Sequence, residues 1–188
     1  MSQRINLRNV TTLLVDSDQF TRGLVANMLR GFGMDMPTQV ETGAAAKAHL
    51  QHQCPDLCIF EAVLPDMTSA DLIAWIRRLS GPTRFVPTIV LTGYTQLRMV
   101  AAARDGGANI VVKKPVAPKT LFDRIVWIAR TARPFIETPD YVGPDRRFRT
   151  GEPPDGQYKR DSDEAESKAA GEDTDSSDKG RVPKWLVK

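Results

Sequence analysis

Cysteine and histidine are scarce in this sequence, which has two of each among 188 residues. Cys54 and Cys58 stand four positions apart, and no second Cys or His pair at metal-ligand spacing accompanies them. The sequence therefore predicts neither a zinc site nor a disulfide framework, and we expect both cysteines to be reduced, buried or half-buried thiols. His49 and His52 are one helical turn apart and are expected on a solvated helix face, not at a metal.

Long apolar runs are missing too. No stretch approaches the ~20 consecutive apolar residues that a membrane span needs, and residues 1–9 lack the apolar core of a secretory signal. The 41% of hydrophobic residues is nevertheless enough to build a packed core. We therefore expect a soluble, cytoplasmic protein with no membrane insertion.

Between Thr11 and Arg133, short apolar runs alternate with amphipathic stretches. The runs predict strands at 11–15, 36–40, 56–61, 87–91 and 109–112. Helical spacing begins at Phe20 and stops at Gly31 and Gly33, and it recurs at 43–52, 69–79, 96–104 and 119–133. Strict alternation of strand and helix predicts one domain over 9–133, a flavodoxin-like (βα)5 doubly wound parallel sheet of order 2-1-3-4-5. The last helix is expected to face inward with Leu121, Phe122, Ile125, Val126 and Ile128.

Charged residues follow three of these apolar runs. Asp16-Ser17-Asp18 follows the first, Glu61 ends the third, and Lys114-Pro115 follows the fifth. The carboxyl ends of parallel strands meet at one edge of a sheet, where α/β proteins place their reactive groups. Acids and a lysine converging there predict a corner that handles a cation or a phosphate.

With Leu64-Pro65-Asp66, these motifs resemble the receiver domain of two-component response regulators, the CheY-like family. The resemblance implies that Asp16 stands where an acid helps to hold Mg²⁺, and that Thr92 and Lys114 stand where side chains contact phosphoryl oxygens. It also implies that Glu61 occupies the position of the family's phosphoryl acceptor, which is an aspartate.

Other positions depart from the family's pattern. Ser17 stands in the place of the second magnesium acid, Ser69 replaces a customary glycine, and Val111 falls where an aromatic residue reports phosphorylation. We therefore expect a degenerate, non-enzymatic site without a metal, in which Glu61 pairs with Lys114. Three interpretations of that pair stay open: a structural ion pair, a standing phosphate mimic, or true phosphorylation of Glu61.

Charge and composition change near Arg133. The net charge of +3 combines +6 over residues 1–133 with −3 over 134–188. Several prolines interrupt the apolar periodicity after Arg133, and Gly143-Pro144-Asp145 predicts a sharp turn. We expect residues 134–150 to be an arginine-rich ligand-binding arm, and 151–188 to be an acidic disordered tail with a basic and apolar end.

Arginine's planar fork of donors grips phosphate or a guanine edge, and it stacks on flat rings. A carboxylate can accept the remaining hydrogens of the same base. The arm therefore suits a guanine nucleotide with several phosphates, cyclic di-GMP in particular. The residues expected to bind it are Tyr141, Asp145, Arg146, Arg147, Phe148, Arg149 and Arg133.

The arm also resembles the arginine-rich stretch of the CheY-like cyclic di-GMP effectors, which implies docking on a protein target such as the flagellar motor switch, at the flagellar base. Alternatives for the arm are a solvated linker or anion patch, nucleic acid, and a membrane surface. The adjacent acidic tract argues against DNA, and the prolines argue against a membrane helix. For the whole protein, the alternative function is a ligand-free adaptor built on a locked receiver. In either case no cofactor is expected.

Overall fold

A computed structural model describes residues 6–93, 97–131, 133–138 and 141–145 of the chain. Five parallel strands form one sheet of order β2-β1-β3-β4-β5, which confirms the predicted flavodoxin-like fold. The strands are β1 (Thr12–Val15), β2 (Thr38–Val40), β3 (Leu57–Glu61), β4 (Thr88–Thr92) and β5 (Ile110–Lys113). Each strand lies within two residues of its predicted place.

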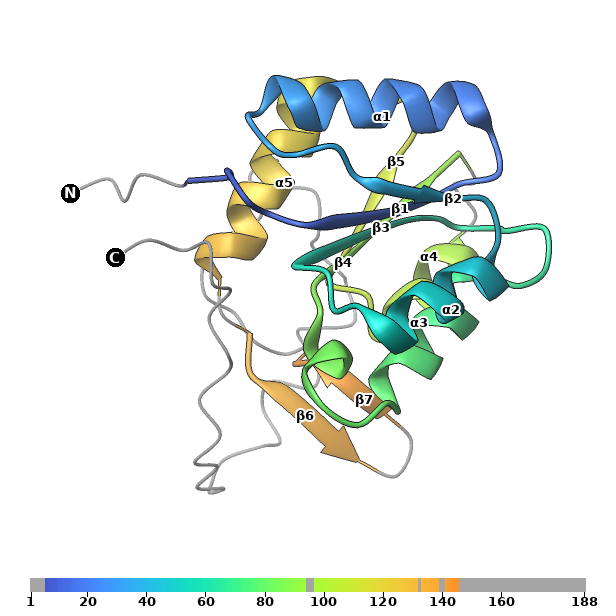
Figure 1. The fold of residues 1–188 in the computed structure, drawn as a ribbon. Coiled ribbons are helices and arrows are strands. Elements are labelled where there is room, and N and C mark those ends of the chain that lie inside the picture. The colour runs from blue at the N-terminus through green and yellow to red at the C-terminus, as the bar shows by residue number, and fades with distance from the viewer. Residues whose placement is uncertain (1–5, 94–96, 132, 139–140, 146–188) are drawn as a thin grey trace.

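Five α-helices and one 3-10 helix connect the strands. They are α1 (Gln19–Gly31), α2 (Gly43–His52), α3 (Ser69–Arg77), η1 (Pro82–Phe85), α4 (Leu97–Asp105) and α5 (Pro118–Arg130). Helices α1 and α5 cover one face of the sheet, and α2, α3 and α4 cover the other (Figure 1). In the described part of the chain, no helix has both the length and the apolar character needed to cross a membrane.

Each face of the sheet packs its own core. Leu14, Ile59 and Leu91 meet apolar residues of α1 and α5 on one face, and all three are at most 2% exposed. Leu13, Phe60 and Val90 meet α2, α3 and α4 on the other face. Central strands are buried on both faces, as parallel sheets require.

Some predicted positions were wrong. Helix α5 ends at Arg130, three residues before the predicted end, and Phe122 is 37% exposed on it. Helical spacing alone did not separate the inward stripe of Leu121, Ile125 and Ile128 from residues at its margin. Cys58 is buried as expected, but Cys54 is exposed, because it lies in the loop after α2.

A β-hairpin follows the receiver-like body where no regular structure was expected. Strands β6 (Phe135–Thr138) and β7 (Tyr141–Pro144) pair antiparallel, and Thr138 faces Tyr141 across a two-residue connection. The turn predicted at Gly143-Pro144 is therefore wrong, because both residues belong to β7. Aromatic and β-branched residues on either side of a two-residue loop are a hairpin signal, and the prolines obscured it.

The hairpin lies beside α3 and η1 (Figure 1). Phe135 packs edge-to-face on Phe85 of η1 with ring centroids 5.1 Å apart. β7 abuts the turn between α4 and β5, where the carbonyl of Val142 approaches Gly107. This turn precedes β5, so the hairpin sits at the amino ends of the strands. The predicted acid–lysine corner lies at their carboxyl ends.

Candidate functional site

The residues of the predicted corner come together at the carboxyl ends of four strands. Asp16 directly follows β1, Glu61 ends β3, Thr92 ends β4, and Lys114 directly follows β5. The register of the sheet puts Glu61 beside Leu91 and Thr92 beside Lys113, so the four ends are level. A backbone hydrogen bond of 2.8 Å from Lys114 to the carbonyl of Thr92 ties the last two together.

Lys114 holds both acids of the corner. Its ammonium lies 2.7 Å from Oδ2 of Asp16, and it also donates to Oε2 of Glu61, which confirms the predicted Glu61–Lys114 pair. Only 6% of the Asp16 side chain and 14% of the Glu61 side chain are exposed. Burial would lower the pKa of Lys114, but hydrogen bonds and charges from Asp16 and Glu61 outweigh it and raise that pKa above its ordinary 10.5.

Every carboxylate oxygen of this pair of acids has a donor. The second oxygen of Asp16 accepts from the backbone N–H of Asp18 at 2.9 Å, and the second oxygen of Glu61 accepts from the N–H of Ala62 at 2.8 Å. A cation entering here would have to displace the lysine, because Mg²⁺ needs carboxylate oxygens as ligands. The described residues contain no cluster of three or more potential metal ligands.

Two nearby acids serve as helix caps instead. Asp18 accepts from Phe20 and Thr21 at the start of α1, and a hydrogen bond from the Thr21 hydroxyl is the main reason its pKa is lowered. Asp66 accepts from the N–H groups of Gly43 and Ala44, 2.8 Å each, at the start of α2. In the described part of the chain, Lys114 forms its ion pairs with Asp16 and Glu61 and with neither Asp18 nor Asp66. Ser17, between Asp16 and Asp18, is exposed.

The described part of the arm gathers at the base of the hairpin. The N–H of Asp145 donates to the carbonyl of Pro134 at 2.8 Å, and the Tyr141 hydroxyl donates to the carbonyl of Pro144 at 2.7 Å. Burial lowers the pKa of Arg133, whereas the nearby Tyr141 and Asp145 act in the opposite direction. Three of the seven predicted ligand residues are thus neighbours. Arg146, Arg147, Phe148 and Arg149 lie outside the described residues, as does the tail 151–188.

Two residues of this region, Trp127 and Arg77, were not singled out from the sequence. The guanidinium of Arg133 stacks 4.6 Å above the ring of Trp127 on α5, and the Arg133 Nε is buried without a hydrogen-bond partner among the described residues. Arg77, at the end of α3, is 1% exposed. Its guanidinium lies 5.0 Å from the ring of Phe135, so it joins the hairpin to the body. An arginine at the end of a helical pattern gives no signal of burial.

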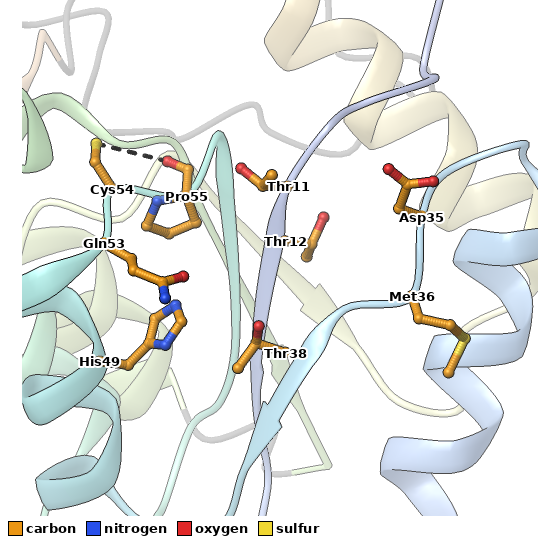
Figure 2. A pocket seen from close by; sticks show the side chains of 9 residues that line it. All are labelled: Thr11, Thr12, Asp35, Met36, Thr38, His49, Gln53, Cys54 and Pro55. Atoms are coloured by element: carbon orange, nitrogen blue, oxygen red, sulfur yellow. Dashed lines mark hydrogen bonds between the residues drawn. The ribbon is translucent and has the colours of Figure 1, made fainter.

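Figure 2 shows a shallow hollow at the amino ends of β1 and β2. It measures about 180 Å³, and none of the predicted site residues lines it. Its lining residues are Thr11, Thr12, Asp35, Met36, Thr38, His49, Gln53, Cys54 and Pro55. Sites for drug-sized ligands usually measure roughly 300–1,000 Å³, so this hollow is too small for a dinucleotide.

Residues 12–126 match the family profile described as the response regulator receiver domain. The chain belongs to this family. The match spans β1 to α5 and contains Asp16, Glu61, Thr92 and Lys114. It stops before the hairpin.

Curated relatives of this receiver include the DNA-binding response regulator MtrA of Mycolicibacterium smegmatis, 32% identical over 113 residues. That match covers 60% of the chain and 47% of MtrA, so the chain spans about half the length of that relative. A second relative is an uncharacterized 14.6 kDa protein of Leptolyngbya boryana, 33% identical over 61% of the chain and 86% of the relative.

Solved receivers have the same fold. A putative response regulator of Chloroflexus aurantiacus aligns with a TM-score of 0.58 and 27% identity, over 61% of this chain and 93% of that one. The receiver domain of the sensor histidine kinase PA1611 of Pseudomonas aeruginosa aligns with a TM-score of 0.57 and 26% identity, over 62% of this chain and 93% of that one. That structure has a magnesium ion coordinated in its active-site cleft. CheY4 of Vibrio cholerae, a chemotaxis response regulator, aligns with a TM-score of 0.57 and 25% identity, over 62% of this chain and 96% of that one.

Proposed function

We propose that this receiver is a phosphorylation-independent signalling adaptor that binds cyclic di-GMP through its C-terminal arm and then docks on a protein target, such as the flagellar motor switch. The single observation that carries the first half is the Asp16–Lys114–Glu61 contact. A lysine already pairs with both acids that would otherwise receive a cation and a phosphoryl group. The receiver therefore needs another input, and the arm that follows its last helix supplies one.

The longer side chain at position 61 favours this view. Glutamate extends one methylene beyond aspartate, by roughly 1.5 Å, and so it reaches the Lys114 ammonium directly. Ser17 adds no carboxylate, and Asp18 is occupied at the start of α1. Covalent switching on this corner would require two ion-paired acids to separate from their lysine.

Chemistry of the arm supports the choice of ligand. Cyclic di-GMP offers two guanine edges and two phosphates, and clustered arginines recognise both groups with bidentate hydrogen bonds. The base of the hairpin holds Arg133, Tyr141 and Asp145 together, and Arg146 continues directly from Asp145. A fixed base reduces the number of residues that must be ordered on binding, and so reduces the entropic cost.

Calorimetry with cyclic di-GMP tests the proposal. The intact chain should bind, whereas a chain that ends at Arg133 should not. Binding that survives the truncation would show that the arm is not the site, and absence of binding by the intact chain would overturn the ligand altogether. Arg146→Ala or Arg147→Ala should each weaken binding by about 1–3 kcal/mol if the side chain contacts a base. Arg78→Ala, on an exposed arginine after α3, is the matched control.

The receiver fold is also compatible with one alternative, a ligand-free protein-interaction adaptor. This alternative keeps the locked corner and drops the nucleotide. It expects the full chain and the truncated chain to capture the same protein target, with no response to cyclic di-GMP. The DNA binding of MtrA is not transferred to this chain, because the match covers about half of MtrA.

A further inference from the structure

Arg77 is the most unusual charged residue of the body. Its guanidinium donates six hydrogen bonds, all to neutral oxygens, and none of the acceptors is a carboxylate. Its acceptors are the carbonyls of Arg84, Val86 and Gly107 and the side chains of Thr88 and Asn109. A buried charge held only by dipoles is costly unless water is kept away and every donor is used.

These acceptors mark the beginnings of two strands. Thr88 is the first residue of β4, and Asn109 directly precedes β5. Asn109 also accepts from the N–H of Thr88 at 2.9 Å, so both strands start from one network around Arg77. The far ends of the same strands carry Thr92 and lead to Lys114. Arg77 thus holds the amino ends of the two strands that build half of the corner.

Strand β7 covers this network by close backbone contact. A Cβ on Gly143 would stand 3.0 Å from the Cα of Gly107, and within its own strand it would also meet the Tyr141 hydroxyl oxygen at 2.6 Å. A Cβ on Gly107 would meet the carbonyl of Val142 at 2.9 Å and the side chain of Arg77 at 3.1 Å. Gly107 also has a φ of +97°, which only glycine adopts readily. On the other strand of the hairpin, Phe135 stacks on the guanidinium of Arg77.

We propose that the β6–β7 hairpin is a latch on the receiver body: its docking over Arg77 and Gly107 fixes β4, α4 and β5, and so fixes Lys114 in the acid–lysine corner. Helix α4 belongs to the same unit, because it follows Thr92 in the chain and ends at the Gly106-Gly107 turn. When the hairpin undocks, Arg77 is exposed to water, and the amino ends of β4 and β5 are held less firmly.

This latch also regulates the arm, a step that rests on the proposed function. Arg133 is tied to α5 by its stack on Trp127, and Arg146 continues from β7. A nucleotide that touches both Arg133 and the arm therefore binds the docked hairpin in preference to the undocked one. By linkage, ligand binding stabilises docking, and docking raises affinity for the ligand.

Hydrogen exchange of the full, ligand-free chain, followed by mass spectrometry, tests the latch. Gly143→Val introduces a good strand former into β7 and places a side chain against both Gly107 and the Tyr141 ring. Gly31→Val is the matched control, because a Cβ on Gly31 meets nothing within 4 Å. Gly143→Val should accelerate exchange in 86–92 and 105–114 as well as in 133–145. Acceleration confined to 133–145, or equal acceleration in Gly31→Val, would overturn the latch.

A second pair of variants distinguishes loss of the latch from a general loss of folding. Phe135→Ala removes the ring over Arg77, whereas Ile136→Ala truncates an exposed neighbour on the same strand. Phe135→Ala alone should reproduce the exchange pattern of Gly143→Val, including the amide of Lys114. If both alanine variants behave alike, the hairpin does not act through Arg77.

Calorimetry with cyclic di-GMP separates this inference from the proposed function. Phe135→Ala, which leaves the predicted ligand residue Tyr141 unchanged, should bind about tenfold more weakly than wild type if the docked fraction falls to about one tenth. Equal affinities would overturn the link between latch and ligand. If wild type does not bind at all, the proposed function and this link fail together, and the exchange experiment alone decides the ligand-free latch.

Discussion

The side-chain ammonium of Lys114 lies 2.7 Å from the carboxylate of Asp16, across strands that are 98 residues apart in the sequence. The same ammonium pairs with Glu61, so one positive charge serves two acids. Each remaining oxygen of the two carboxylates accepts a backbone N–H. The hydrogen-bonding groups of the corner are therefore satisfied by the protein itself, which has three testable consequences.

Wild-type protein should not gain a stable phosphoryl group from a small phosphodonor with Mg²⁺. Both groups would have to displace Lys114, and only one acid is available beside Glu61 for the cation. Intact-mass measurement checks this. The double variant Ser17→Asp with Glu61→Asp supplies a second acid and a shorter acceptor, and it should gain the group. A stable mass increase on Glu61 of the wild type would contradict the prediction.

Replacing Lys114 with methionine should destabilise the protein by about 2 kcal/mol at neutral pH, below the 3–5 kcal/mol of a fully buried pair because 20% of the Lys114 side chain is exposed. Urea unfolding gives the value. Lys119→Met removes a lysine that is 86% exposed and pairs with Asp123, and it should cost less than about 1 kcal/mol. Equal losses would mean that the corner adds no stability.

The loss of stability in Lys114→Met should depend on pH. Asp16 and Glu61 raise the pKa of Lys114 above 10.5, so the folded protein holds this proton more tightly than the unfolded chain does. The resulting stability is fully present below pH 10.5 and is lost as pH rises through the folded pKa. The difference between wild type and Lys114→Met should therefore shrink above pH 10.5. A stability difference between the two proteins that stays constant as pH rises would contradict this prediction.

Arg77→Met should lower the free energy of unfolding by about 3 kcal/mol or more, because it leaves several buried carbonyls without donors. Burial lowers the pKa of Arg77 to about 10, which is still well above neutral pH, so the guanidinium stays charged there. Arg78→Met, one residue later and exposed, should change stability by less than about 0.5 kcal/mol. Equal effects would show that Arg77 only fills space.

Strand periodicity and strand-end chemistry predicted most of the fold and the corner. Short apolar runs placed β1 to β5 correctly, and the rule that parallel strands present their carboxyl ends together brought Asp16, Glu61 and Lys114 to one edge. The side chains that terminate those runs are the polar residues of the site. In such a fold, local patterns and long-range placement agree, so the sequence alone is informative.

Hairpin and latch were not predictable in the same way. Phe135–Thr138 and Tyr141–Pro144 form strands only because they pair with each other, and prolines flank them. Arg77 follows Leu72, Ile73 and Ile76 in α3, and an arginine side chain is seldom fully buried. Its burial depends on carbonyls of η1 and of the turn at Gly107. Such acceptors are backbone groups, which leave no trace in a residue pattern.

The loop after β3 gives a final prediction, at acid pH. Asp66 matches the family's Leu-Pro-Asp motif, and here it caps α2 by accepting from Gly43 and Ala44. The hydrogen bond from Gly43, opposed by desolvation and helped by Ala44, lowers the pKa of Asp66 below 3.8. Its contribution to stability is therefore present above pH 3.8 and is lost as pH falls through the folded pKa.

Asp66→Asn should accordingly lower the melting temperature at neutral pH and have a smaller effect well below pH 3.8. Asp35→Asn, on an exposed aspartate of the loop after α1, is the control and should show little change at either pH. Thermal unfolding followed by circular dichroism compares the three proteins. A loss in Asp66→Asn that is as large in acid as at neutral pH would show that the carboxylate charge does not stabilise α2. The loop would then be held by the Leu64–Met67 backbone bond, and the helix cap would be incidental.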